Sequence, residues 1–229
     1  MITYASLKHN EEIRTYIKRA DESLRALGFT EHSFAHVTRV SEVAAEILEQ
    51  LGYDAHTIEL TKIAGYLHDI GNLVNRVDHS QSGAVMAFRI LDRMGMPPED
   101  IATVVTAIGN HDEGTGVPVN AVSAALILAD KSDVRRTRVR NEDFATFDIH
   151  DRVNYSVTAS KLVLVKRMVM TPLIMVNTLF PASPAISTNK FGWKKTAKTA
   201  ANAVETNNVM IEGTFLAIIM AVANGTIIS

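Results

Sequence analysis

The chain has 229 residues, of which 47% are hydrophobic and 21% charged, with a formal net charge of −2. This composition is typical of a soluble globular protein, and the near-neutral charge argues against stable nucleic-acid binding. The absence of cysteine excludes disulfides, thiolate metal sites and a cysteine nucleophile. The amino terminus resembles no export signal, and no apolar run reaches the roughly 20 residues of a membrane span, so we expect a cytoplasmic protein without membrane contact.

Charge is distributed unevenly along the chain. Residues 1–151 carry 23 acidic and 15 basic side chains, a net charge of −8, whereas residues 152–229 carry two acidic and eight basic side chains, a net charge of +6. This change of sign predicts two regions. We assign residues 1–152 to a helical, metal-binding catalytic domain and residues 153–229 to an accessory region whose function no motif indicates.

Apolar residues recur at helical spacing through most of the first region. Capping residues and terminating glycines divide this pattern into six predicted helices, at about residues 11–27, 30–51, 55–69, 80–94, 98–111 and 121–131. Six helices with short connections predict an all-α helical bundle. The accessory region is predicted to be α+β, with a strand at 157–164, an apolar segment at 169–180, a helix at 194–205 and a buried apolar run at 214–222.

One histidine–aspartate pair stands at the end of an apolar stripe. His68 and Asp69 close the predicted third helix, directly after Leu67. A carboxylate beside a buried stripe is costly unless a partner neutralises it, and a divalent cation is the strongest such partner. Further histidines and an aspartate stand at other helix ends or loop starts, namely His36, His79, His111 and Asp130.

Six ligands exceed what one tetrahedral ion uses, so they predict two metal ions. We assign His36, His68, Asp69 and Asp130 to one ion. Asp69 would bridge to a second ion that His79 and His111 hold. Imidazole and carboxylate ligands without sulfur suit divalent Fe, Mn, Zn, Co or Ni.

The blocks that carry these residues fall in a recognisable order: His36-Val-Thr-Arg-Val40, Leu67-His-Asp-Ile-Gly71, Asp78-His-Ser-Gln-Ser-Gly83, Gly109-Asn-His-Asp-Glu113 and Leu128-Ala-Asp-Lys131. Over about residues 30–140 they resemble the HD-domain metal-dependent phosphohydrolases. The resemblance is greatest to the dinuclear branch that includes bacterial diadenosine polyphosphate hydrolases. Several two-metal members have a lysine where this chain has Asn72, so no phosphate contact is expected from that position. The Gly-Tyr-Pro signature of cyclic di-GMP phosphodiesterases is absent.

The resemblance and the ligand set together imply a metal-dependent phosphohydrolase. We expect it to cleave a phosphoester or phosphoanhydride bond in a nucleotide or dinucleotide, by hydroxide that two cations generate from water. Lys131, Arg135, Arg136 and Arg76 are the predicted contacts to the phosphorylated substrate, because phosphate oxygens require cationic partners. We expect, however, that at least two of the basic residues after Asp130 lie on a solvated helix face.

Three residues are assigned catalytic roles. Asp69 would bridge the metals, Lys131 would neutralise charge, and Asp112 (or its neighbour Glu113) would orient His111 or relay a proton. His9, His32, His56 and His150 belong to no block and are assigned no role.

Two alternative functions stay open. One is a di-iron oxygenase of the HD fold, which uses the same six ligand types, and the other is a non-catalytic regulatory domain that binds metal. The basic cluster after Asp130 favours a phosphorylated substrate. An oligomer is compatible with the sequence.

Overall fold

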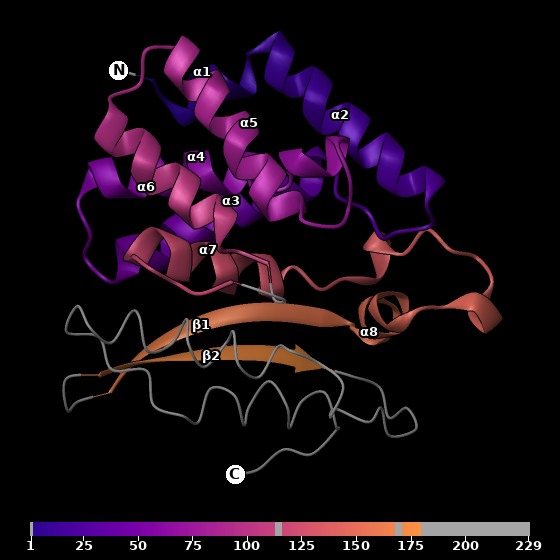
Figure 1. Ribbon diagram of the computed structural model, residues 1–229. Coiled ribbons are helices and arrows are strands. Elements are labelled where there is room, and N and C mark those ends of the chain that lie inside the picture. Colours follow the sequence, from indigo (N-terminus) through magenta and orange to yellow (C-terminus); the bar gives the residue numbers. More distant parts are fainter. Residues whose placement is uncertain (1, 113–115, 168–170, 180–229) are drawn as a thin grey trace.

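The computed structural model describes residues 2–112, 116–167 and 171–179 (Figure 1). Its helical elements are α1 (Tyr4–Lys8), α2 (Glu11–Ala26), α3 (Phe34–Gln50), α4 (Ala55–Leu67), η1 (Ile70–Leu73), α5 (His79–Arg93), α6 (Pro98–Gly109), α7 (Ala121–Ser132), η2 (Arg136–Arg138), η3 (Phe144–Thr146) and α8 (Ile149–Ser156). Two strands follow, β1 (Ala159–Arg167) and β2 (Thr171–Leu179). The predicted all-α bundle is confirmed. None of the helices in these ranges is long and apolar enough to cross a membrane.

The six predicted helices correspond to α2–α7, and their boundaries follow the capping residues. The side chains of Asn10, Asp54 and Asn120 accept hydrogen bonds from backbone N–H groups at the starts of α2, α4 and α7. The second helix begins later than predicted, because Ser33 rather than a residue near 30 is its N-cap. The five-residue α1 was not predicted, since it is too short to show a periodic pattern.

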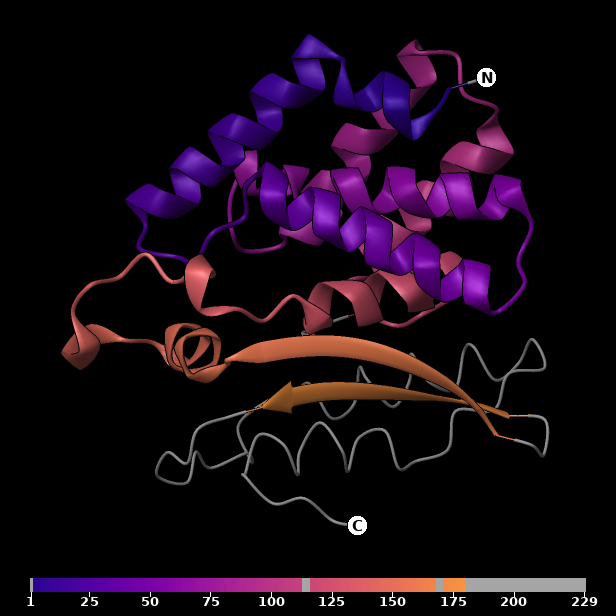
Figure 2. The same cartoon turned by 180° about the vertical axis from the view of Figure 1, so that it is seen from behind.

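The strands form a separate layer beside the bundle. Figures 1 and 2 show β1 next to α7, with α8 at the start of β1. β1 and β2 pair antiparallel, with Ala159 opposite Leu179 and Arg167 opposite Thr171. The predicted strand at 157–164 is thus observed two residues later, and most of the apolar segment 169–180 forms its partner. The predicted helix at 194–205 and the run at 214–222 lie outside the described residues.

The arrangement of α3, α4 and α7 positions the residues of the predicted metal site. A Cβ on Gly65 of α4 would lie 2.7 Å from the Ser41 Cα, so only glycine permits this close crossing with α3. Helix α7 packs against both helices, and ten of its twelve residues are buried. A helix buried on all sides has no polar face, which explains why its sequence is almost uniformly apolar until Asp130.

A second close approach joins η1 to the start of α5. A Cβ on Gly71 would overlap the carbonyl oxygen of His79 and the backbone nitrogen of Gly83. The turn into α5 places Asp78 at φ 56°, in the left-handed region that aspartate tolerates better than most residues. The first residue of α5, His79, therefore lies directly against the segment that follows Asp69.

Candidate metal centre

Four buried histidines direct their Nε2 atoms toward a common region between the helices. In each ring Nδ1 lies within hydrogen-bond distance of an oxygen that can only accept, so Nδ1 carries the proton of the neutral imidazole. The Nε2 atom consequently presents a lone pair, as a metal ligand requires. The four pairs are His36 with Asp133 Oδ2 (2.8 Å), His68 with the Gly65 carbonyl (2.8 Å), His79 with the Arg76 carbonyl (3.1 Å) and His111 with the Ile108 carbonyl (2.7 Å).

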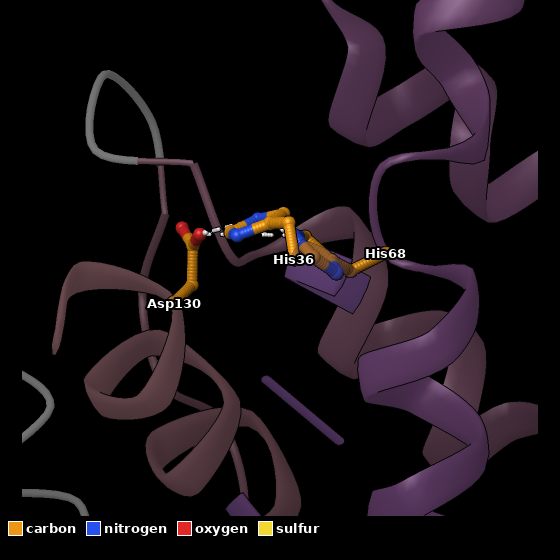
Figure 3. Close-up of side chains that lie close together, drawn as sticks. All are labelled: His36, His68 and Asp130. Atoms are coloured by element: carbon orange, nitrogen blue, oxygen red, sulfur yellow. Dashed lines mark hydrogen bonds and ion pairs between the residues drawn. The ribbon is translucent and has the colours of Figure 1, made fainter. Parts of the chain in front are cut away.

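The first group of ligand atoms comes from α3, the end of α4 and α7. The Nε2 atoms of His36 and His68 are 3.3 Å apart, and Figure 3 shows both rings beside the Asp130 carboxylate. Asp130 Oδ1 lies 3.3 Å from the Nε2 atom of His36 and 3.7 Å from that of His68. Asp69 Oδ2 lies 3.3 Å and 3.1 Å from the same two nitrogens. Ligand atoms at the usual distance from one tetrahedral ion are about 3.3 Å apart, so this group has the right size.

The second group shares Asp69 with the first. The Nε2 atoms of His79 and His111 are 3.2 Å apart. Asp69 Oδ1 lies 3.4 Å from the former nitrogen and 3.8 Å from the latter. One carboxylate oxygen of Asp69 thus faces each pair of histidines, which is the geometry of a bridging ligand. The two groups are close together, since His68, Asp69 and His111 also offer ligand atoms within 4.8 Å of one another.

These residues fit divalent cations for two reasons. Asp69 Oδ2 is buried without a hydrogen-bond partner among the described residues. In addition, the Nε2 atoms of His79 and His111 lie 3.2 Å apart, and two neutral imidazoles that both carry their proton on Nδ1 cannot hydrogen-bond each other through these atoms. A cation in each group would satisfy both the lone pairs and the carboxylate.

The electrostatics of the cluster favour positive charge at its centre. Burial alone lowers the pKa of His68, but the carboxylates of Asp69 and Asp130 overcome this and raise it to about 10. Burial raises the pKa values of both aspartates, yet His68 beside Asp69 and Lys131 beside Asp130 hold them well below the usual range. At the other group, burial lowers the pKa of His79 to about 4, so this ring is neutral at physiological pH.

Two predicted substrate contacts lie at the cluster. Lys131 Nζ donates to Asp130 Oδ2 at 2.8 Å, and Arg76 Nη1 lies 3.2 Å from His79 Nε2. Asp112 directly follows His111, but its side chain makes no hydrogen bond with the described residues. Glu113 lies outside them.

The other two predicted contacts lie elsewhere. Arg135 donates to Asp133 Oδ1 (2.9 Å) and to Glu31 Oε2 (2.8 Å), and Arg136 Nε donates to the Tyr155 carbonyl (2.7 Å). Neither arginine touches any of the six predicted ligands, because α7 ends at Ser132 and the chain turns away from the cluster.

Sequence reasoning missed two residues that orient ligands. Asp133 fixes the ring of His36 through Nδ1, and Asn72 Nδ2 donates to Asp69 Oδ1 at 3.0 Å. Each stands three residues after a predicted ligand, Asp130 or Asp69, and i, i+3 residues on a helical turn share one face. That spacing is the signal by which they could have been found.

Asp133→Asn should weaken metal binding by about 10–100-fold, because an amide does not hold the His36 tautomer as firmly as a carboxylate. Direct titration with Mn²⁺ or Co²⁺, monitored by calorimetry, measures this. Asp92→Asn, a change at an exposed aspartate of α5, is the matched control. Unchanged affinity in Asp133→Asn would show that this carboxylate does not orient a ligand.

His79→Ala should lose one metal ion and keep the other, since only the second group includes this ring. Metal analysis of the purified variant gives the stoichiometry. His56→Ala removes an exposed histidine that pairs with Asp100 outside the cluster and should leave the metal content unchanged. An unaltered stoichiometry in His79→Ala would restrict the site to four ligands.

Comparisons with known proteins found similarity over the part of the chain that contains the cluster. Residues 33–142, which contain all six predicted ligands, match the family model of the HD domain. An uncharacterized protein of Methanocaldococcus jannaschii is 26% identical over 160 residues, in an alignment that covers 60% of this chain and 61% of that protein. The chain thus spans about three fifths of the length of this relative. The crystal structure of a predicted HD superfamily hydrolase from an uncultured Thermotogales bacterium has 29% sequence identity and a TM-score of 0.44, covering 56% of this chain and 69% of that one.

Proposed function

From the match of residues 33–142 to the HD domain and from the cluster within them, we propose that the chain is a metal-dependent phosphohydrolase. Its substrate is a nucleotide or dinucleotide, in which it cleaves a phosphoester or phosphoanhydride bond. The observation that carries the proposal is the placement of Asp69, whose two carboxylate oxygens face two different pairs of histidines. Centres with two ions bridged in this way suit in-line displacement at phosphorus.

The distances between ligand atoms divide the proposed ligands into two groups. His36, His68, Asp69 and Asp130 would hold one ion, and Asp69, His79 and His111 would hold the other. When bound, divalent cations would supply an activated water near neutral pH and neutralising charge for the phosphoryl oxygens. Asn72 fixes the orientation of the Asp69 carboxylate, and Asp133 fixes that of the His36 ring.

Cationic side chains stand on both sides of the proposed centre. Lys131 is next to the Asp130 carboxylate of the first group, and Arg76 is next to the His79 ring of the second. A substrate with more than one phosphate can therefore contact a positive charge on each side. Asp112, directly after the ligand His111, is the proposed group for proton transfer to the leaving oxygen.

The test is a phosphate-release assay of the full chain, loaded in turn with Mn, Fe, Co and Ni. The substrates are nucleoside mono-, di- and triphosphates and dinucleoside polyphosphates. We expect turnover of at least one substrate, and its loss in His68→Ala. If no metal supports turnover of any substrate while metal analysis shows that the ions are bound, the phosphohydrolase proposal is wrong.

Arg76→Gln should lower kcat/KM for the substrate by about tenfold or more, the value of one charge-assisted contact to phosphate. Its metal content should stay unchanged, because Arg76 is not one of the proposed ligands. Arg89→Gln, at an exposed arginine of α5, is the control. Equal kcat/KM values for Arg76→Gln and the unaltered chain would exclude this contact.

A further inference from the structure

A groove of about 280 Å³ lies on the opposite side of Asp133 from the metal centre. It is lined by Arg39 of α3, by the segment Asp133–Thr137 and by Val157–Ser160 at the start of β1. The Asp133 carboxylate contacts His36 Nδ1, whereas the metal centre lies at His36 Nε2. Asp133 and an imidazole ring therefore separate the groove from the metal centre.

The groove has an excess of positive charge. Four arginines gather around it, but among the residues that the structure describes only two carboxylates, those of Asp133 and Glu31, pair with them. The contacts are Arg39 Nε to Asp133 Oδ1 (3.1 Å), Arg135 Nε to Asp133 Oδ1 (2.9 Å), Arg135 Nη2 to Glu31 Oε2 (2.8 Å), Arg138 Nη1 to Asp133 Oδ2 (3.9 Å) and Arg136 Nε to the Tyr155 carbonyl (2.7 Å). The lining consequently attracts anions.

Two of these arginines keep their terminal donors available. Arg39 Nε forms an ion pair with Asp133, Arg136 Nε donates to the Tyr155 carbonyl, and no hydrogen bond joins the Nη groups of either arginine to the described residues. The Arg136 guanidinium also stacks over the Tyr155 ring at 4.5 Å, and the Arg39 side chain is 48% exposed. Held at Nε and stacked on Tyr155, the Arg136 guanidinium is oriented before a ligand arrives, which lowers the entropy cost of binding.

We propose that this groove is a second ligand site, separate from the metal centre, which binds the phosphate group of a small anion. The Nη groups of Arg39 and Arg136 donate to the phosphate oxygens, since the planar guanidinium matches their geometry. The volume is near the lower end of the roughly 300–1,000 Å³ of small-molecule sites, enough for a phosphate with a further small moiety.

The experiment titrates the full chain, depleted of metal by chelation and dialysis, with inorganic phosphate, adenosine monophosphate and adenosine, followed by calorimetry. Metal depletion removes phosphate binding that depends on ions at the other site. Arg39→Gln and Arg136→Gln are the test variants, and Arg89→Gln is the control at an exposed arginine outside the groove. Thermal unfolding of each variant checks that it is folded.

Saturable binding of phosphate or adenosine monophosphate is expected, with an affinity that falls by about tenfold in each test variant and stays unchanged in Arg89→Gln. Equal affinities for the two anions would identify free phosphate as the ligand, and tighter binding of the monophosphate would identify a nucleotide. The proposal is overturned if the metal-depleted chain binds neither anion, if adenosine alone binds as well as the monophosphate, or if folded Arg39→Gln and Arg136→Gln keep full affinity. Because phosphate release by the metal-loaded chain is measured separately, failure here leaves the phosphohydrolase proposal unaffected.

Discussion

Asp69→Ala should remove both metal ions from the protein and abolish metal-dependent activity. The carboxylate oxygens of Asp69 lie 3.1–3.8 Å from the Nε2 atoms of all four clustered histidines, so one substitution takes a ligand from each ion. Loss of a residue that merely orients a ligand costs about 10–100-fold in metal affinity. Loss of a shared ligand should cost more, and metal analysis after dialysis should find neither ion retained.

Two further measurements make the Asp69 result specific. Asp92→Ala removes an exposed carboxylate of α5 and should retain full metal content. Circular dichroism should show that Asp69→Ala keeps its helices, because the variant removes a buried charge without creating an overlap. A folded Asp69→Ala protein that still holds two ions would show that this residue does not bridge them.

Gly71→Ala should destabilise the protein by about 3 kcal/mol or more, at the upper end of the usual cost of overpacking. The added methyl group would overlap backbone atoms of His79 and Gly83, and backbone cannot rotate away as a side chain can. Relief requires η1 and α5 to separate, which also moves Asp69 away from His79. We therefore expect weaker binding of the second ion as well, measured by urea unfolding and by metal titration.

Gly109→Ala is the matched control, because its added Cβ would meet only the Ala84 Cβ, at an ordinary 3.5 Å. The unfolding free energy of that variant should stay close to that of the unaltered chain. If Gly71→Ala is equally stable and binds both ions normally, the close approach of η1 and α5 is not required for the site.

Much of the fold follows from local rules that can be read along the chain. Apolar residues at helical spacing, bounded by caps such as Asn10, Asp54 and Asn120, predict α2–α7 because each helix must bury one face. These rules do not predict α1, which is too short to show a periodic pattern. They also do not predict the exact start of α3, since several polar residues near Ser33 could have been its cap.

The candidate site was predicted only in part, and Arg135 and Arg136 show why. Counted along the sequence, they follow Asp130 within two helical turns and would share its surroundings. Helix α7 ends at Ser132, however, and from Asp133 onward the chain no longer follows helical geometry. Their placement beside Glu31 and Tyr155, residues far from them in the sequence, depends on how α3 and α8 pack.

By itself the sequence determined which residue types stand at the ends of buried helices, because helix length and termination are local properties of the chain. Only the tertiary structure decided that Nδ1 of each of the four imidazoles faces an acceptor oxygen. It also decided that the two oxygens of Asp69 face different pairs of these rings. These relations join atoms on α3, on α5 and just after the ends of α4 and α6, and they depend on close backbone contacts at Gly65 and Gly71. The spacing of residues along a chain specifies a helix. Side-chain atoms from different helices come within about 3 Å of one another only after the helix backbones have packed together.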